Sequence, residues 1–511
     1  MTDWTEGYVA DIGYTFGYYT ELNPLRIRLA FANAGLVFPE IGTACELGFG
    51  QGMSTNIHAA ASVVQWSGTD FNPSQAAFAQ ELAAASGSGA RLFDDAFADF
   101  CTRSDLPDFD FISLHGIWSW ISDENRAVIV DFIRRKLKVG GVLYISYNTL
   151  PGWASFAPMR HLMSQHAAVM GADGMGIAKR IDAAIGFADK LLGTNPLYVR
   201  ANPAVVERLK GVGKHNRQYL AHEYFNTVWD PMYFADMAKW LAPAKVGYAC
   251  SAHLHDHVDS INLTADQQAF LQNIPDAMLR QTVRDFMVNQ QFRRDYWVKG
   301  ARKLSAIDQA EAIRALRLML VVPRADVSLK VNGSLGEAKM SEEIYVPLLD
   351  ALSQHQALTV GELEQLLAPH RIGFGKLNQA VLVLAGAGHV ALVQDVETIA
   401  RARPASERLN RHLLQRSRGS ADVSCLASPV TGAGVAVHEF HQLFLLCMLQ
   451  GQDQPAQWAI FAWNLLALQG QRLVKQGKAL ETAEQNLAEL TEQAHTFATK
   501  QLPILKALQV I

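Results

Sequence analysis

The stretch TACELGFGQG, residues 43–52, decides the fold. Its first half has the apolar pattern of a short strand, and a helical segment follows its glycines. Gly48, Gly50 and Gly52 therefore form a turn between a strand and a helix, where glycine lets a ligand approach the backbone closely. The spacing is G-x-G-x-G rather than the G-x-G-x-x-G of dinucleotide sites, and the first 135 residues hold no lysine, which excludes a P-loop.

Strand-like and helix-like segments alternate over the first 150 residues. Pro73 suits the first turn of a helix, and Gly140 with Gly141 suits a helix end that leads into a strand. Strands that alternate with helices predict an α/β fold with a doubly wound, Rossmann-like parallel sheet. The expected strands are 43–48, 64–69, 90–93, 109–114 and 141–147, and the expected helices are 53–63, 73–85 and 123–138.

From residue 155 to about 240 the pattern is mainly helical. Two later strand-like pieces, 245–252 and 292–300, are expected to return to the edge of the first sheet, which makes the helical stretch an insertion. A separate small domain would give the same pattern.

Two further units follow toward the C-terminus. Residues 341–393 have the order of a winged helix, and Thr359 with Glu362 fits a capping box. A DNA-reading helix should be basic, whereas 376–386 holds one lysine among mostly apolar residues, so we expect this helix to pack in a core. A stripe at helical spacing in the tail is also expected to be core, and it consists of Leu480, Ala483, Leu487, Leu490, Ala494 and Phe497.

Composition places the chain among ordinary globular proteins. Of 511 residues, 49% are apolar and 18% are charged, which excludes disordered chains and coiled-coil rods. The five cysteines lie far apart without a CxxC pair, as expected in a reducing compartment. The N-terminus has no apolar signal region, and the longest nearly apolar run, 381–393, is too short to span a bilayer. We therefore expect a cytoplasmic protein without a membrane span.

The net charge of −4 hides an asymmetry between the two parts of the chain. Residues 1–135 carry seven arginines against seventeen acidic residues, a net −10, which leaves +6 for the remainder. An acidic first lobe repels polyanions, which disfavours a nucleic-acid partner. The charge either lines a cleft or coats the surface, and the sequence leaves both open.

Acidic residues end the second and third predicted strands. Asp70 follows the second strand, where a carboxylate can accept hydrogen bonds from both ribose hydroxyls of a nucleoside. Asp94 and Asp95 close the third strand, where an adenine amino group would lie. With the glycine turn, these residues fit an S-adenosylmethionine site better than a dinucleotide site. The alternative for Asp70 is a turn or helix-cap role, because Asn72 and Pro73 follow it.

Several motifs together resemble a known family. ELGFGQG (46–52), ELNP (21–24) after GYY (17–19), HGIWSW (115–120), SYNTLPGW (146–153) and YLAHEYFN (219–226) look like class I S-adenosylmethionine-dependent methyltransferases that carry a methyltransferase regulatory domain. The layout is similar to bacterial protein-lysine methyltransferases of outer-membrane proteins. The resemblance implies five domains: an S-adenosylmethionine-binding core at 1–153, a helical insertion at 154–240, a regulatory region completing the core sheet at 241–303, a winged-helix-like middle domain at 304–400 and a mainly helical C-terminal domain at 401–511.

The resemblance also implies roles for individual residues. The cofactor loop would be Gly48, Gly50 and Gly52, with Glu46 at its start, and Asp70 would hold the ribose. Asp95 and Ala96 would flank the adenine, and His115 would begin the loop after the fourth strand. That loop reads HGIW instead of the NPPY type, which argues against planar nitrogen acceptors.

Methyl transfer needs the acceptor aligned with the S–CH3 bond, and a lysine acceptor must also lose a proton. His115 is our candidate for a base or proton relay, with a structural loop histidine as the alternative. Tyr147 and Asn148 are further catalytic candidates at the end of the fifth strand. Candidates for the acceptor side are Trp118, Trp153 and Tyr18. From the N-terminal side, the cofactor would be covered by Tyr14, Tyr18 and Tyr19. The alternative for each of these aromatic residues is ordinary core packing.

The leading hypothesis is therefore an S-adenosylmethionine-dependent methyltransferase that modifies lysine side chains of a protein. A small-molecule acceptor, such as a sugar or lipid precursor, and a non-catalytic cofactor-binding scaffold are the alternatives. A homodimer stays open. No metal site is expected: His253, His255 and His257 would share one face of a strand without a second ligand group, and HEFH (438–441) has the wrong spacing for a zinc helix.

Overall fold

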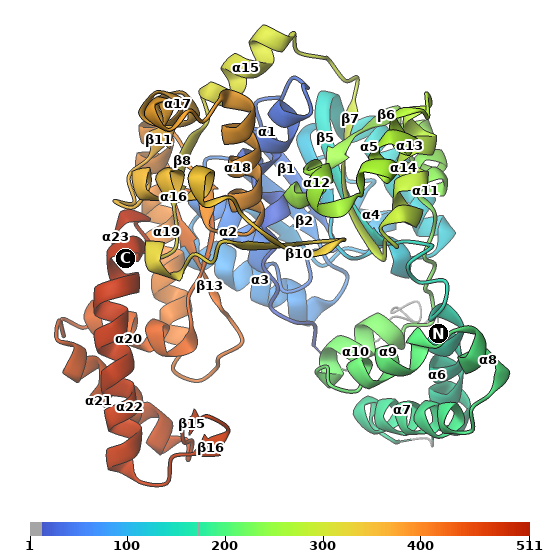
Figure 1. Ribbon diagram of the computed structural model, residues 1–511. Coiled ribbons are helices and arrows are strands. Elements are labelled where there is room, and N and C mark those ends of the chain that lie inside the picture. Colours follow the sequence, from blue (N-terminus) through green and yellow to red (C-terminus); the bar gives the residue numbers. More distant parts are fainter. Residues whose placement is uncertain (1–12, 172–173) are drawn as a thin grey trace.

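The computed structural model describes residues 13–171 and 174–511. Its centre is a seven-stranded sheet in the order β3-β2-β1-β4-β5-β7-β6 (Figure 1). β7 is antiparallel to both of its neighbours, and the other neighbouring pairs are parallel. The strands are β1 (Thr43–Leu47), β2 (Gln65–Thr69), β3 (Arg91–Phe93), β4 (Phe109–Leu114), β5 (Leu137–Asn148), β6 (Val246–Ser251) and β7 (Phe292–Lys299).

The doubly wound sheet predicted from the alternation of strands and helices is confirmed. Asn72 caps the helix that starts at Pro73, since its side chain accepts a hydrogen bond from the backbone N–H of Ser74 at 3.0 Å. β6 and β7 lie at the sheet edge, as expected from their sequences. The helices that connect the parallel strands are α2 (Met53–Ala61), α3 (Pro73–Ser86), α4 (Phe97–Phe100) and α5 (Asp123–Lys136).

One predicted boundary is wrong. Helix α5 ends at Lys136 and β5 begins at Leu137, so Gly140, with φ of 85°, lies inside the strand and not at a helix end. The register of β5 against β4 shifts between Phe109 and Phe111, which is the irregularity of a β-bulge. A glycine with positive φ is typical of such a bulge.

The segment between β5 and β6 is a helical insertion with a core of its own. Trp153, Phe156, Leu209 and Leu220 belong to this core and are buried. Figure 1 shows most of the insertion as a lobe at the lower right, separated from the C-terminal helices at the lower left. Its helices are α6 (Ala157–Met170), α7 (Ile177–Gly193), α8 (Leu197–Ala201), α9 (Ala204–Val212) and α10 (Arg217–Tyr224), and α11 (Phe234–Leu241) leads back to the sheet.

A middle unit packs beside the N-terminal helix α1 (Pro24–Asn33) and joins it in one hydrophobic core. Its three strands pair in the order β11-β8-β12, and the capping box of Thr359 and Glu362 is confirmed. The apolar residues of α18 are buried, which confirms packing for that helix. The unit contains α15 (Ala306–Arg314), β8 (Arg317–Leu320), β9 (Lys330–Gly333), β10 (Gly336–Lys339), α16 (Glu342–Ala351), β11 (Leu358–Thr359), α17 (Val360–Leu366), α18 (Phe374–Gly386) and β12 (Val390–Leu392).

The C-terminal part is mainly helical and packs against helices that flank the sheet: α19 contacts α2 and α3, and the hairpin of β13 and β14 contacts α2. Leu490, Ala494 and Phe497 of the predicted stripe are buried, whereas Ala483 is exposed because it is the first residue of its helix. The elements are α19 (Val396–Arg416), β13 (Cys425–Ser428), β14 (Ala433–Ala436), α20 (Glu439–Leu449), α21 (Pro455–Leu468), β15 (Val474–Lys475), β16 (Lys478–Ala479), α22 (Ala483–Thr496) and α23 (Leu502–Ala507).

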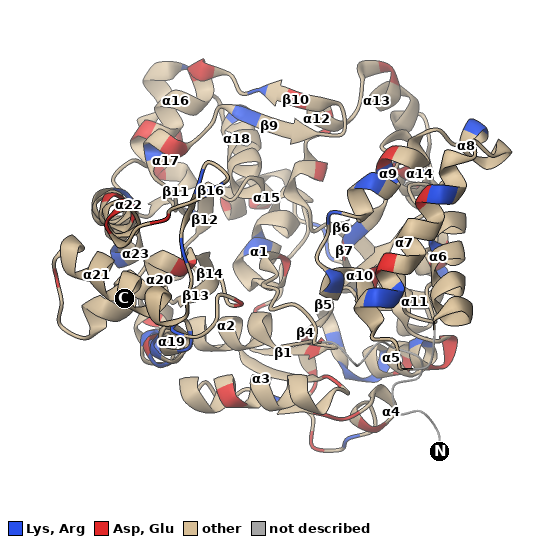
Figure 2. Cartoon of the chain, turned by 90° about the horizontal axis from the view of Figure 1, so that it is seen from below, with Lys and Arg blue, Asp and Glu red and all other residues tan. Residues whose placement is uncertain are grey.

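Most of the acidic charge of the first lobe coats the outer surface. Figure 2 shows acidic segments around α3 and α4 at the rim, and Asp94, Asp99 and Asp105 are exposed there. Some of these groups pair with neighbouring arginines, as Asp105 does with Arg103 at 3.0 Å. Among the described residues, no helix is both long and apolar enough to cross a lipid bilayer.

Candidate active site

The glycine turn after β1 has a backbone that favours glycine at three positions. φ is 73° at Gly48, 58° at Gly50 and 67° at Gly52, all in the left-handed region. A Cβ added at Gly52 would lie 2.5 Å from Cβ of Ala79, and one at Gly48 would lie 2.7 Å from Cγ2 of Ile117. The turn is therefore packed closely from the protein side, and a side chain at either position would displace a neighbour.

Asp70, at the end of β2, fastens this turn. Its Oδ2 accepts a hydrogen bond from the backbone N–H of Gly50 at 2.8 Å, and its Oδ1 accepts one from the N–H of Asn72 at 3.1 Å. The helix cap itself is Asn72, so the cap role considered for Asp70 belongs to its neighbour. Burial raises the pKa of Asp70 to about 7.

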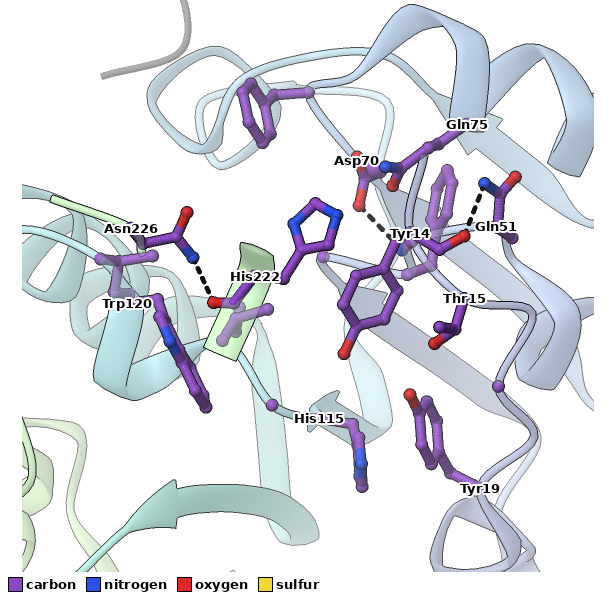
Figure 3. A pocket seen from close by; sticks show the side chains of 18 of the residues that line it. Tyr14, Thr15, Tyr19, Gln51, Asp70, Gln75, His115, Trp120, His222 and Asn226 are labelled. Atoms are coloured by element: carbon purple, nitrogen blue, oxygen red, sulfur yellow. Dashed lines mark hydrogen bonds between the residues drawn. The ribbon is translucent and has the colours of Figure 1, made fainter. Parts of the chain in front are cut away.

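A pocket with an empty volume of about 830 Å³ lies over the turn and Asp70 (Figure 3). Its wall comes from segments that are distant in the sequence: the N-terminal segment, the turns after β1 and β2, the start of α4, the loop after β4, and α10 with the residues that follow it. Aromatic rings dominate it. The side chains that line it include Tyr14, Tyr19, Gln51, Asp70, Phe71, Gln75, Phe97, His115, Ile117, Trp120, Ile121, His222, Glu223 and Asn226.

His115 lies in this wall, as predicted, and is held on two sides. Its ring stacks on Tyr19 with centroids 3.5 Å apart, and its Nδ1 lies 2.8 Å from the hydroxyl of Tyr144. Burial lowers the pKa of His115 to about 4, so the imidazole is neutral at pH 7. Tyr14, which we expected to cover the cofactor from the N-terminal side, also lines the pocket.

Helix α10 supplies a carboxylate that the sequence analysis did not assign to the site. Glu223 lines the pocket with His222 and Asn226. Burial raises the pKa of Glu223 to about 7, although the charge of Arg160 favours the ionised form. A carboxyl group with a pKa near neutrality is suited to binding a cation or accepting its proton. The sequence signal was YLAHEYFN, which we quoted only for the family resemblance.

Three predicted catalytic or acceptor residues lie outside this wall. Tyr147 is buried in β5, where its hydroxyl donates to Asp295 at 3.0 Å. Asn148 accepts a hydrogen bond from Nε1 of Trp153 at 3.2 Å. Trp153 is buried in the core of the insertion lobe, with its ring 5.0 Å from that of Trp229. These residues connect β5 to the insertion.

The remaining predicted residues also lie around the pocket and not in its wall. Trp118 is buried, and its Nε1 lies 3.4 Å from the sulfur of Met232. Tyr18 packs near His58, and Glu46 is buried beneath the turn, where it accepts a hydrogen bond from Thr55. Asp95 forms an ion pair with Arg103 at 2.9 Å, and Ala96 precedes α4 beside it.

The three alternating histidines do not form one face of a strand. They lie at and within a short 3-10 helix, Leu254–His257. One ring nitrogen of each histidine contacts a different group: the carboxylate of Asp256 for His253, the carbonyl of Val383 for His255 and the carbonyl of Ser251 for His257. Over residues 13–171 and 174–511, no group of three or more His, Cys, Asp or Glu residues could hold a metal ion.

Comparisons with known proteins agree with this architecture. Residues 216–299 match the family model of a predicted methyltransferase regulatory domain, which starts at α10 and ends with β7. The uncharacterized protein sll1526 of Synechocystis sp. is 40% identical over 513 residues, covering 99% of both chains. The uncharacterized protein RP028 of Rickettsia prowazekii is 30% identical over 128 residues, covering 25% of this chain and 49% of its own.

The fold is shared with a solved structure over almost its full length. PKMT2 from Rickettsia typhi, in complex with AdoHcy, superposes with a TM-score of 0.70 at 15% identity, covering 97% of this chain and 99% of that chain. The match includes the insertion, middle and C-terminal parts as well as the sheet, so the whole arrangement of the chain is a conserved fold.

Proposed function

Because the chain belongs to the class I methyltransferases that carry a methyltransferase regulatory domain, we propose that it transfers the methyl group of S-adenosylmethionine to lysine side chains of a protein. One observation carries the proposal. A single pocket is lined by the glycine turn, by Asp70, by a second carboxylate, Glu223, and by several aromatic rings. The first pair suits a nucleoside cofactor, and the second carboxylate suits a cationic amine.

The residues present fit the cofactor. S-adenosylmethionine supplies, when bound, a methyl group that its sulfonium charge has already activated. The glycine turn leaves room for the cofactor beside the backbone, and Asp70 offers a buried carboxylate to the ribose hydroxyls. The AdoHcy in PKMT2 is the product form of the same cofactor, which supports this assignment. We propose that Glu46 holds the turn from beneath through Thr55, while Asp95 and Ala96 stay predictions for the adenine side.

Glu223 and the aromatic wall suit the acceptor. A lysine ammonium that enters the pocket meets the carboxylate of Glu223 and a wall that includes Tyr14 and Trp120, and aromatic rings attract a cation. The amine becomes a nucleophile only after it loses a proton. Glu223, with a pKa of about 7, takes that proton at neutral pH, and the enclosed pocket keeps the lone pair aligned with the methyl group.

His115 has a different part in this scheme. A neutral imidazole with a pKa of about 4 is a weak base at pH 7. Its stacking on Tyr19 and its bond to Tyr144 fix the aromatic wall beside the acceptor. We therefore propose His115 as a positioning residue, and its role as a proton relay stays a prediction.

Labelling tests the proposal directly. The purified protein is incubated with a lysate and S-adenosylmethionine carrying an isotopically labelled methyl group, and digested proteins are searched for labelled methyl-lysine by mass spectrometry. Glu223→Gln should lose most of the label while still binding the cofactor, and Glu207→Gln, an exposed substitution on the neighbouring helix α9, is the matched control. Label found only in small molecules would favour a sugar or lipid-precursor acceptor, and cofactor binding without any labelled product would favour a scaffold.

A further inference from the structure

A second cavity shares the N-terminal segment with the active-site pocket: Tyr18, Thr20 and Glu21 line this cavity, whereas Tyr19 lines the pocket. The second cavity has an empty volume of about 1360 Å³, part of it open to solvent. Four parts of the chain form its wall: the N-terminal segment with α1, the regulatory region, the middle unit and the hairpin of β13 and β14. Cavities of this kind, where domains meet, are frequent binding sites.

Part of the wall of this cavity is polar and carries a net positive charge. Arg26 of α1 and Arg294 of β7 line the cavity with Glu21, which pairs with Arg294 at 2.9 Å. Within the described part of the chain, Nε of Arg26, Nε of Arg294 and Oγ1 of Thr431 are buried without a hydrogen-bond partner. Buried polar groups are almost always satisfied, so three such atoms around one cavity indicate a missing acceptor.

Most of the remaining wall is apolar. Val322 of the middle unit and Val435 of β14 line it, together with small residues at the end of α18 and in the loop that follows. An anion without a carbon skeleton would leave these walls uncovered, whereas an acid with a short apolar chain would cover them and place its carboxylate near the arginines.

We propose that this cavity binds a small organic acid, whose carboxylate bonds to Arg26 and Arg294 and whose apolar chain covers Val322 and Val435. The location connects the acid to the active site. Glu21 and Tyr19 are two residues apart, and Tyr19 stacks on His115 in the wall of the pocket. A carboxylate on Arg294 competes with Glu21, and this displacement changes the position of Tyr19. Binding in the cavity therefore changes the affinity for S-adenosylmethionine, and the cofactor changes the affinity for the acid by the same factor.

Calorimetry with hexanoate tests the site on the full chain. We expect one saturable site, and we expect Arg26→Gln to weaken binding by about tenfold or more because a charge-assisted hydrogen bond is lost. Val322→Phe takes up space at the apolar part of the wall without changing a charge, and it should weaken binding too. Arg28→Gln is the matched control, since Arg28 lies on the same helix and pairs with the exposed Glu40.

Each other result would overturn a stated part of the inference. The proposed site is refuted if the wild type and Arg26→Gln have equal affinity for hexanoate, or if hexanoate does not bind at millimolar concentration. Binding of inorganic phosphate or of the neutral hexanamide as tight as that of hexanoate removes the organic-acid assignment. An affinity for S-adenosylmethionine that saturating hexanoate leaves unchanged removes the coupling. These readouts are binding constants, so they do not depend on the methyl acceptor.

Discussion

Replacing Glu223 by glutamine provides the sharpest test of the acceptor chemistry, because it removes the proposed base and keeps the shape of the side chain. With a pKa of about 7, Glu223 is about one tenth ionised at pH 6 and about nine tenths ionised at pH 8. At saturating cofactor and low acceptor concentration, the wild-type rate should therefore rise about tenfold between these pH values and level off above pH 8.

The glutamine variant should follow another profile. Without a base, only lysine that is already neutral reacts, and the ordinary lysine pKa of about 10.4 makes this fraction grow about tenfold per pH unit. The variant should be slower than the wild type by roughly 10²-fold or more at pH 8, and its rate should still climb at pH 9.

Initial rates of methyl transfer to the acceptor protein found by labelling, measured from pH 6 to 9, distinguish the two profiles. Glu207→Gln, which removes an exposed carboxylate in the same lobe, should keep the wild-type profile. Cofactor affinity is measured in parallel at each pH, so that a change in cofactor binding is not mistaken for a change in chemistry. A wild-type rate that climbs tenfold per unit throughout, or a glutamine variant with the wild-type rate, would refute the reasoning.

Three further substitutions test the cofactor side. Gly52→Ala should destabilise the fold by about 2–5 kcal/mol, because it strains a left-handed backbone and overlaps with Ala79. Adding Ala79→Gly to this variant should restore part of the thermal midpoint, and equal midpoints for the single and double variants would contradict this. The pKa of Asp70 is raised to about 7, so the affinity of the wild type for S-adenosylmethionine, measured by calorimetry, should grow from pH 6 to pH 8. The affinity of Asp70→Asn should be weak and independent of pH. A wild-type affinity that does not change with pH would argue against the ribose contact. Burial raises the pKa of Glu46 from its ordinary 4.5 to about 8, so the folded chain holds a proton that the unfolded chain releases, and stability falls as pH rises across this range. Glu46→Gln should therefore show a smaller fall in thermal midpoint by circular dichroism, and an equal fall in both proteins would contradict that origin.

The sheet and the cofactor side were predictable because their signals are local. Alternating apolar runs, Pro73 and the glycine turn mark each element within a few residues. β1 and β2 are adjacent and parallel, so their carboxyl ends meet at one edge and bring Gly50 within hydrogen-bonding distance of Asp70. The strand character of β6 and β7 was predictable too, but it fitted a separate small domain as well as the return to the sheet that the structure shows.

The acceptor side was not predictable in the same way. Glu223 comes to the pocket on a helix of the insertion lobe, and helical periodicity shows which face of a helix is buried without showing what it is buried against. Tyr147 was proposed as a catalytic residue and Trp153 as an acceptor-side residue because they lie at the end of the fifth strand and shortly after it. β5 is buried on both faces near its end, so the pattern could not tell a side chain that faces the pocket from one that faces the regulatory region.

The position of Glu223 changes what the regulatory domain means for this chain. The matched segment, 216–299, supplies β7 and β6, the last two strands at one side of the sheet, and the helix that carries Glu223. The pocket thus takes one carboxylate, Asp70, from the acidic first lobe and the other from the regulatory segment, while the remaining acidic charge stays mostly at the surface. Deleting the segment would expose β5 and remove the acceptor wall at once, so loss of activity in such a truncation cannot distinguish regulation from catalysis. Regulation and catalysis are distinguished only by substitutions that keep the sheet intact. A substitution at Glu223 tests the chemistry, and one at Arg26 tests the second cavity.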